Sequence, residues 1–264
     1  MFPRIAPAFV IIAVLSGLGF GTTSVWAQLP TVAPEEVGLS PERLARVSEA
    51  FQSYADDGRI AGAVGLVARH GKLAWTEAWG MRDLAAGDPM EEDDIFRIFS
   101  MTKPITSVAV MMLWEEGHFR LDDRIGRYLP ELGNMVVADL ERSTGPDDIV
   151  AVPAEHQITI RDLLRHTAGL SYGLTFGRTA ADRAFARANP TSQATLANMV
   201  TELGKLPLAL QPGTRWRYSA ATDVLGRLVE VISRQAFDVF LRDRIFEPLG
   251  MDDTAFFVPD SKRD

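Results

Sequence analysis

Cysteine is absent from all 264 residues of the sequence. Disulfides, thiolate metal sites and lipid attachment at a cysteine are therefore excluded together. A metal site would have to combine histidines with carboxylates, but the acidic clusters stand in short loops without histidines at ligand spacing. We interpret these clusters as solvated turns and expect neither a metal nor another cofactor. They lie at residues 91–94, 122–123 and 147–148.

Basic residues are the minority charge, with 27 lysines and arginines against 35 acids and a formal net charge of −8. Such a surface repels nucleic acid and anionic lipid, and the sequence has no basic run or stripe of aromatic residues and arginines. We therefore expect no nucleic-acid partner. With 47% hydrophobic and 23% charged residues, the composition is that of a globular protein.

Apolar runs long enough to cross a membrane, roughly 20 residues, are also missing. The longest run, residues 5–20, is broken by Pro7, follows Arg4 and precedes a short stretch that ends at Ala27. This layout is typical of a cleaved export signal. We therefore predict a signal peptide at residues 1–27, an exported protein that is periplasmic or secreted, and no stable membrane anchor.

The remaining residues, 28–264, are predicted to form one domain of the α+β class. Ser40 followed by Pro41 predicts a helix start, and two β-type runs around His70-Gly71 predict a hairpin. A sheet of only two or three strands is rarely stable by itself. We therefore expect helices to cover these strands or further strands to join them. The expected helices cover residues 100–116, 160–166, 193–203, 220–234 and 236–246, the hairpin strands 63–68 and 73–79, and one late strand 254–258.

A candidate nucleophile and base, Ser100 and Lys103, stand three positions apart. At a helix start such a pair shares one face, so the amine can take the proton of the hydroxyl. A lysine base needs surroundings that disfavour its charged form, and Phe96, Ile98 and Phe99 predict an apolar setting. Ser-x-x-Lys alone is a weak signal, because chance and helix capping also produce it.

A second signature lies in residues 211–220, where a Pro-Gly turn leads to Tyr218 just before a predicted helix. The Tyr218 phenol is a candidate for moving protons between the serine oxygen and the leaving group. The alternative is a core or rim tyrosine with a satisfied hydroxyl. Trp216 is near enough in sequence to line an acyl pocket.

These stretches resemble the serine β-lactamase and penicillin-binding protein superfamily, and most of all its class C-like carboxylesterase branch, the family VIII esterases. The resemblance implies Ser100 as nucleophile, Lys103 as base and Tyr218 as second proton-transfer group. It also implies a helical domain set against an antiparallel sheet with flanking helices. The matching stretches are residues 95–103, 159–170, 212–219 and 246–251.

Two departures from the family pattern bear on function. The class C-like β-lactamases carry a substrate-contacting asparagine where this chain has Ala220, so the resemblance places Ala220 at the substrate site and favours ester substrates over antibiotics. The family's Lys-Thr-Gly motif, or a Gly-rich equivalent on a late strand that supplies an oxyanion N–H, is not found. We therefore expect residues 28–264 to be an incomplete version of the fold that lacks its C-terminal strands.

Three functions stay open at this point. The first is a cofactor-free serine hydrolase that cleaves small-molecule carboxylic esters through an acyl-enzyme. The second keeps the acylation but takes an amide, as a β-lactamase or a D-alanyl-D-alanine carboxypeptidase does. The third is an inactive remnant or a binding module. The sequence predicts no oligomeric state.

Two further patterns compete with this catalytic assignment. Residues 169–173 match G-x-S-x-G around Ser171, but an elbow serine needs a preceding strand and a later histidine. All four histidines precede Ser171, so we reject the elbow. His166 ends a predicted helix, where histidine often serves the last carbonyls, and we interpret it as structural.

Overall fold

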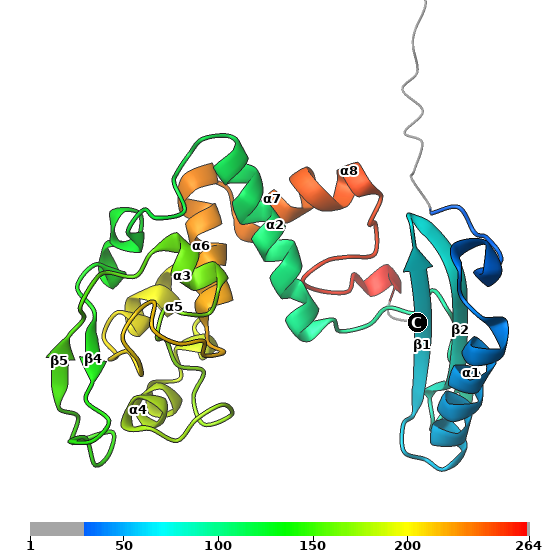
Figure 1. Ribbon diagram of the computed structural model, residues 1–264, viewed down its shortest axis with the longest axis horizontal. Coiled ribbons are helices and arrows are strands. Elements are labelled where there is room, and N and C mark those ends of the chain that lie inside the picture. Colours follow the sequence, from blue (N-terminus) through cyan, green and yellow to red (C-terminus); the bar gives the residue numbers. More distant parts are fainter. Residues whose placement is uncertain (1–28, 263–264) are drawn as a thin grey trace, which may run out of the picture.

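The computed structural model describes residues 29–262, and these fall into two parts (Figure 1). The first part is a small sheet with helix α1 against it, which we call the sheet unit, residues 29–98. The second is a body of helices, which we call the helical body, residues 99–262. The predicted signal peptide, residues 1–27, lies outside the described residues and stays a prediction.

Helix α1, Pro41–Asp56, begins where the sequence predicts. The Ser40 hydroxyl accepts a hydrogen bond from the N–H of Arg43, and Pro41 takes the first helical position, where an N–H is not needed. The helix packs against strand β2, where the ring of Phe51 stacks on Trp79 with ring centroids 4.8 Å apart. This contact attaches α1 to one face of the sheet.

The predicted hairpin is confirmed as strands β1, Gly62–Arg69, and β2, Lys72–Asp83, which pair antiparallel. His70 and Gly71 form the turn between them, and both have positive φ, 54° and 71°. Positive φ at both central positions suits the right-handed twist of a two-residue hairpin. The short strand β3, Asp88–Pro89, extends the sheet beside β2.

Helices α2, Thr102–Glu115, and α6, Ala221–Ser233, pack against each other in the helical body. Their facing residues belong to one continuous apolar core, which includes Leu113 and Leu225. The other helices are α3 Ile160–Leu164, α4 Ala180–Ala188, α5 Leu196–Leu203, α7 Phe237–Leu241, a π-helical turn Arg242–Phe246 and α8 Glu247–Leu249.

Three details of the predicted secondary structure are wrong. Residues 254–258 form no strand, because no other described strand lies beside them to pair. A short antiparallel pair was not predicted, β4 Val136–Ala138 and β5 Ala151–Pro153, since three-residue strands leave no periodic pattern. Helix α4 was also missed, although Thr179 and Asp182 form a capping box at its start.

The expected fold class is confirmed, with mixed helices and antiparallel sheets in the described residues. Along residues 29–262, every helix is too short or too polar to span a membrane. The fold sets the start of α2 beside the start of α6, and the candidate site lies there.

Candidate active site

Ser100 lies in a 3₁₀ turn, Phe99–Met101, that leads directly into α2. The sequence predicts a helix from Ser100 itself, but the regular helix begins at Thr102. Phe99 has a φ of 42°, in the left-handed region that bulky residues rarely adopt. Strained turns of this kind cluster at functional sites, and here the turn leaves the Ser100 side chain exposed.

Three side chains meet at this turn. The Ser100 Oγ lies 2.6 Å from the Tyr218 hydroxyl. The Lys103 Nζ donates toward the same Oγ at 3.5 Å and lies 4.5 Å from the centroid of the Tyr218 ring. Ser100 and Lys103 belong to α2 and the turn before it, whereas Tyr218 precedes α6. The packing of these helices therefore brings together the three residues that the sequence predicts.

The phenol of Tyr218 has a pKa below its ordinary value of 10.0. Burial alone would raise this pKa, but interactions with Lys103 and Ser100 and the positive charge of Lys103 outweigh it. A cation beside a phenol favours the phenolate. Tyr218 is therefore a better proton acceptor near neutral pH than an isolated tyrosine.

His166 lies behind Tyr218, a position that sequence reasoning did not predict. Its imidazole stacks on the Tyr218 ring with centroids 5.1 Å apart and planes 10° from parallel. Burial, and then the charge of Lys103, lower the pKa of His166, so the ring is neutral at neutral pH. The residue has a φ of 56°, as the chain leaves α3. A neutral histidine thus supports the tyrosine without adding positive charge.

Asp223, on the first turns of α6, adds one carboxyl group behind the site. Burial is the main influence and raises its pKa, although its own backbone hydrogen bond and the nearby charge of Lys103 act in the opposite direction. A carboxyl in an apolar setting gains a proton more readily than one in water. Asp223 is another functional neighbour that the sequence reasoning missed, because nothing local distinguishes it from a solvated helix acid.

Three further aromatic side chains, which we call the aromatic rim, lie beside the Tyr218 ring. Phe176, Tyr172 and Trp216 have ring centroids 4.6, 5.5 and 6.4 Å from that of Tyr218. Trp216 is 67% exposed, so it lies where a bound acyl group could contact it. Ala220 does not: it has no accessible surface, because its methyl group belongs to the apolar core. The prediction that position 220 lines the substrate site is therefore wrong.

The apolar setting expected around Lys103 also differs from the prediction. Phe96 and Phe99 are 48% and 77% exposed, so they do not enclose the amine. Lys103 itself is half-buried. The ring of Tyr218, with its centroid 4.5 Å from Nζ, is an aromatic neighbour of the amine instead. A sequence pattern identifies apolar residues but does not say which side of a turn they face.

Ser171, the rival serine, lies inside the protein. It is 4% exposed, and its hydroxyl donates to Asp182 at 2.6 Å. The described element before it in the chain is helix α3 and not a strand, which agrees with its rejection as an elbow nucleophile. Among the described residues, histidines and acids form no group of three that could hold a metal ion.

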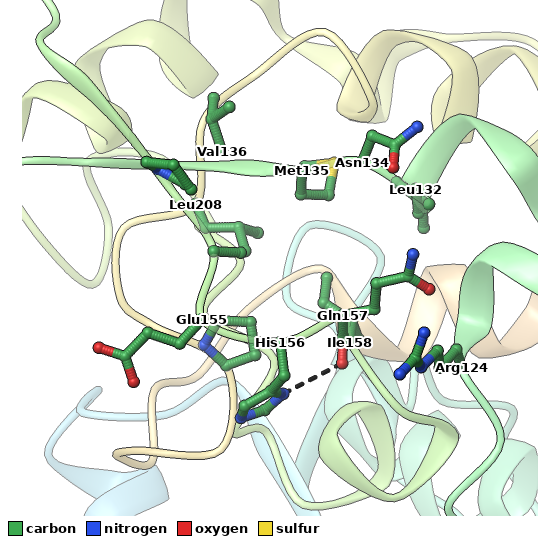
Figure 2. A pocket seen from close by; sticks show the side chains of 14 residues that line it. Arg124, Leu132, Asn134, Met135, Val136, Glu155, His156, Gln157, Ile158 and Leu208 are labelled. Carbon is green, nitrogen blue, oxygen red and sulfur yellow. Dashed lines mark hydrogen bonds between the residues drawn. The ribbon is translucent and has the colours of Figure 1, made fainter.

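A cavity of about 490 Å³ lies away from this site, beside β4 and β5 (Figure 2). Apolar and polar side chains line it together: Leu132, Asn134, Gln157 and Arg124 lie along one side, and Leu208 lies across from them (Figure 2). Neither Ser100 nor the residues that contact it line this cavity. The exposed serine, and not this cavity, therefore marks the chemistry.

Comparisons with known proteins identify the family of the chain. Residues 47–264 match the family model described as Beta-lactamase. Esterase EstB from Burkholderia gladioli is 34% identical over 224 residues, which cover 83% of this chain and 53% of EstB. The lovastatin esterase of Penicillium rubens is 34% identical over 210 residues, covering 78% of this chain and 51% of that enzyme.

A solved structure extends the likeness to the fold. EstCE1, described as a hydrolase with promiscuous acyltransferase activity, superposes with a TM-score of 0.68 at 32% identity and covers 83% of this chain and 54% of EstCE1. The chain thus spans about half the length of the relatives it matches.

Proposed function

The chain belongs to the beta-lactamase family, and we propose that it is a serine hydrolase that cleaves carboxylic esters through an acyl-enzyme on Ser100. One observation carries the proposal: Ser100 Oγ lies 2.6 Å from a tyrosine hydroxyl whose pKa is lowered. A serine becomes an effective nucleophile when a neighbouring base removes its proton. An exposed serine in contact with such a base has no evident structural purpose.

In acylation, Ser100 Oγ attacks the ester carbonyl carbon while its proton passes to the Tyr218 phenolate. The tetrahedral intermediate then expels the alcohol oxygen, which takes that proton from Tyr218, and the acyl group stays on Ser100. Lys103 keeps its positive charge and stabilises the phenolate before the transfer. The sequence prediction made Lys103 the direct base, but its Nζ is the more distant group, at 3.5 Å against 2.6 Å.

In deacylation, water replaces the alcohol. The water oxygen attacks the acyl carbonyl carbon while Tyr218 takes one proton from the water. The intermediate expels Ser100 Oγ, which takes the proton back from Tyr218 and releases a carboxylic acid. The same residues therefore serve both steps, as microscopic reversibility requires for a single proton-transfer group. No cofactor is needed for either step.

The substrate class rests on two supports. Two relatives are esterases by name, and position 220 carries an alanine with no amide and no accessible surface. An ester with an apolar acyl group suits the aromatic rim, because Trp216 and Phe176 offer large exposed apolar faces. A β-lactam or peptide substrate would lose the side-chain amide contact of the class C-like enzymes.

The test compares a short p-nitrophenyl ester with the β-lactam nitrocefin, using the chain and its Ser100→Ala variant. We expect the ester to be hydrolysed, nitrocefin to be left intact, and the variant to be inactive. Turnover of nitrocefin in preference to the ester would contradict the substrate class. If neither substrate is hydrolysed and a fluorophosphonate labels no residue, the catalytic proposal is contradicted and an inactive protein is favoured.

Acyl transfer to an alcohol is a second candidate activity, favoured by the description of EstCE1 as a hydrolase with acyltransferase activity. The acyl-enzyme would then react with an alcohol hydroxyl in place of water. With an added short alcohol, we expect an ester product to form at the expense of free acid. If the acid yield is unchanged at every alcohol concentration, the acyl-enzyme reacts with water alone.

A further inference from the structure

A buried ion pair lies directly beneath the Tyr218 segment. Asp182, on α4, has no accessible surface, and its Oδ1 accepts a hydrogen bond from Arg217 Nη2 at 2.5 Å. Arg217 is the covalent neighbour of Tyr218, so the pair attaches the backbone of the candidate site to α4. Removing one partner of such a pair leaves a buried charge without compensation.

The Asp182 carboxylate is saturated with hydrogen bonds. Besides Arg217, it accepts from the Ser171 hydroxyl at 2.6 Å and from both the N–H and the hydroxyl of Thr179 at 2.8 Å. Burial raises the pKa of Asp182, but these hydrogen bonds outweigh it, and the pKa lies below its usual value of 3.8. The carboxylate therefore stays charged and holds its partners in fixed directions.

The partners of Asp182 hold the Tyr218 segment on both sides of the tyrosine. Before it, the N–H of Arg217 donates to the carbonyl of His166 at 2.8 Å, and His166 stacks on the Tyr218 ring. After it, the N–H of Ala220 donates to the carbonyl of Ser171 at 3.2 Å. Asp182 thus fixes the two residues, Arg217 and Ser171, that bracket the tyrosine.

Gly177 packs closely against the pair. A Cβ at Gly177 would lie 2.1 Å from Arg217 Nη2 and 2.3 Å from Asp182 Oδ2, so a side chain there would displace the ion pair. Arg217 Nε is buried without a hydrogen-bond partner among the described residues. An unpartnered buried donor destabilises a fold. The ion pair of Arg217 with Asp182 must therefore offset this cost.

We propose that Asp182 is a positioning residue for Tyr218, and that it acts through Arg217 and Ser171 to hold the tyrosine hydroxyl against Ser100. This inference rests on the proposed role of Tyr218 in proton transfer. A displacement of about 1 Å at a reacting group lowers the rate by about 100-fold. Asp182 touches no reacting atom, so its effect comes only through the position of the tyrosine.

The experiment uses Asp182→Asn, which keeps the size of the side chain and removes its charge, on the full chain with a p-nitrophenyl ester. We expect kcat to fall by about 10- to 100-fold, and the rise of activity with pH to move to higher pH, because Tyr218 shifts away from Lys103. Arg227→Met is the matched control, since it breaks the Arg227–Glu230 pair on α6 without touching the tyrosine segment.

The double variant Asp182→Asn, Arg217→Met separates positioning from stability. Replacing both charged partners by neutral residues of similar size commonly restores stability. We expect thermal stability to recover while kcat stays low and the pH profile stays shifted. Recovery of kcat and of the pH profile together with stability would overturn the inference.

The inference and the proposed function fail in different ways. If Ser100→Ala and Tyr218→Phe are inactive but folded Asp182→Asn keeps the full kcat, only the positioning role is wrong. If Ser100→Ala itself keeps its activity, the catalytic proposal is wrong and the inference falls with it. If Asp182→Asn does not fold, the kcat of the double variant decides.

Discussion

The sheet unit and the helical body differ in what holds them together. The helical body has one continuous apolar core, with Leu113, Ile125 and Leu225 almost fully buried. In the described sheet unit, the buried apolar residues are only Val37, Ala74 and Trp79. On the sheet face opposite α1, Leu66 is 63% exposed. Because apolar burial is the main stabilising term, most of the stability of the described chain resides in the helical body.

The candidate site belongs to the better packed of these two regions. Ser100 and Lys103 come from the start of α2, and Tyr218 from the segment before α6, its packing partner. Catalysis by position requires reacting groups held to a fraction of an ångström. The comparison thus predicts that changes at buried positions of the helical body lower stability and, near the site, activity as well. Changes in the sheet unit should alter neither by much.

The largest expected effect is on activity alone. Ser100→Ala removes the nucleophile from an exposed turn, so we expect esterase activity to fall by about 1,000-fold or more while stability is unchanged. Ser107→Ala, on the same helix, is the matched control and should keep its activity. Comparable losses in both variants would mean that Ser100 acts through the fold of α2.

Lys103→Met tests the charge beside Tyr218. Without this cation the pKa of Tyr218 returns toward its ordinary value of 10.0, so the phenolate forms only at higher pH. We expect the rise of activity with pH to move upward, and the rate at neutral pH to fall by about 100- to 10,000-fold. A profile that keeps its wild-type midpoint would contradict Tyr218 as the proton acceptor. Tyr218→Phe should lose this rise altogether.

Asp182→Asn connects stability with pH. The pKa of Asp182 in the folded protein is below its usual value of 3.8, so its stabilising contribution is complete above that pH and is lost as the pH falls through the folded pKa. We expect the variant to lose about 3 to 5 kcal/mol at neutral pH, measured by urea unfolding. The difference from wild type should shrink below about pH 4. A constant difference would contradict the charged state of the carboxylate.

A pair of leucines compares the two regions directly. Leu225, 1% exposed in the core, and Leu66, 63% exposed on the sheet, differ only in surroundings. We expect Leu225→Ala to lower the free energy of unfolding by about 2 to 5 kcal/mol, and Leu66→Ala to change it by about 0.5 kcal/mol or less. Equal losses would show that the open sheet face is covered in solution.

Two helix caps give the smallest effect. The hydroxyls of Ser40 and Thr159 cap α1 and α3, one in each region. Removing either hydroxyl should destabilise its own helix by about 0.5 to 2 kcal/mol. We expect global unfolding to report the loss in Thr159→Ala, but only local hydrogen exchange near α1 to report it in Ser40→Ala. Equal global losses would mean that the two regions unfold as one unit.

The sequence predicts most local features, because local chemistry decides them. The cap at Ser40 and the turn at His70-Gly71 form within a few residues, and both are confirmed. Ser100 and Lys103 share one end of a helix, so their proximity follows from helix geometry. Tyr218 was a candidate from its own turn, but only the family resemblance assigned it to the same site, since no local rule relates positions 118 residues apart.

Features that depend on distant partners escape such prediction. The strands β4 and β5 pair with each other across a loop and have three residues each. Asp182 and Arg217 meet across 35 residues, and each alone looks like a surface charge. The burial of Ala220 and the exposure of Phe99 depend on which side of the backbone the core lies. Tertiary packing alone determines these features.

The most direct test of the central claim is covalent labelling by a fluorophosphonate, followed by mass spectrometry of the digested protein. The account predicts one modified residue, Ser100, and no label in the Ser100→Ala variant. Labelling of Ser171, or ester hydrolysis that persists in Ser100→Ala, would contradict it.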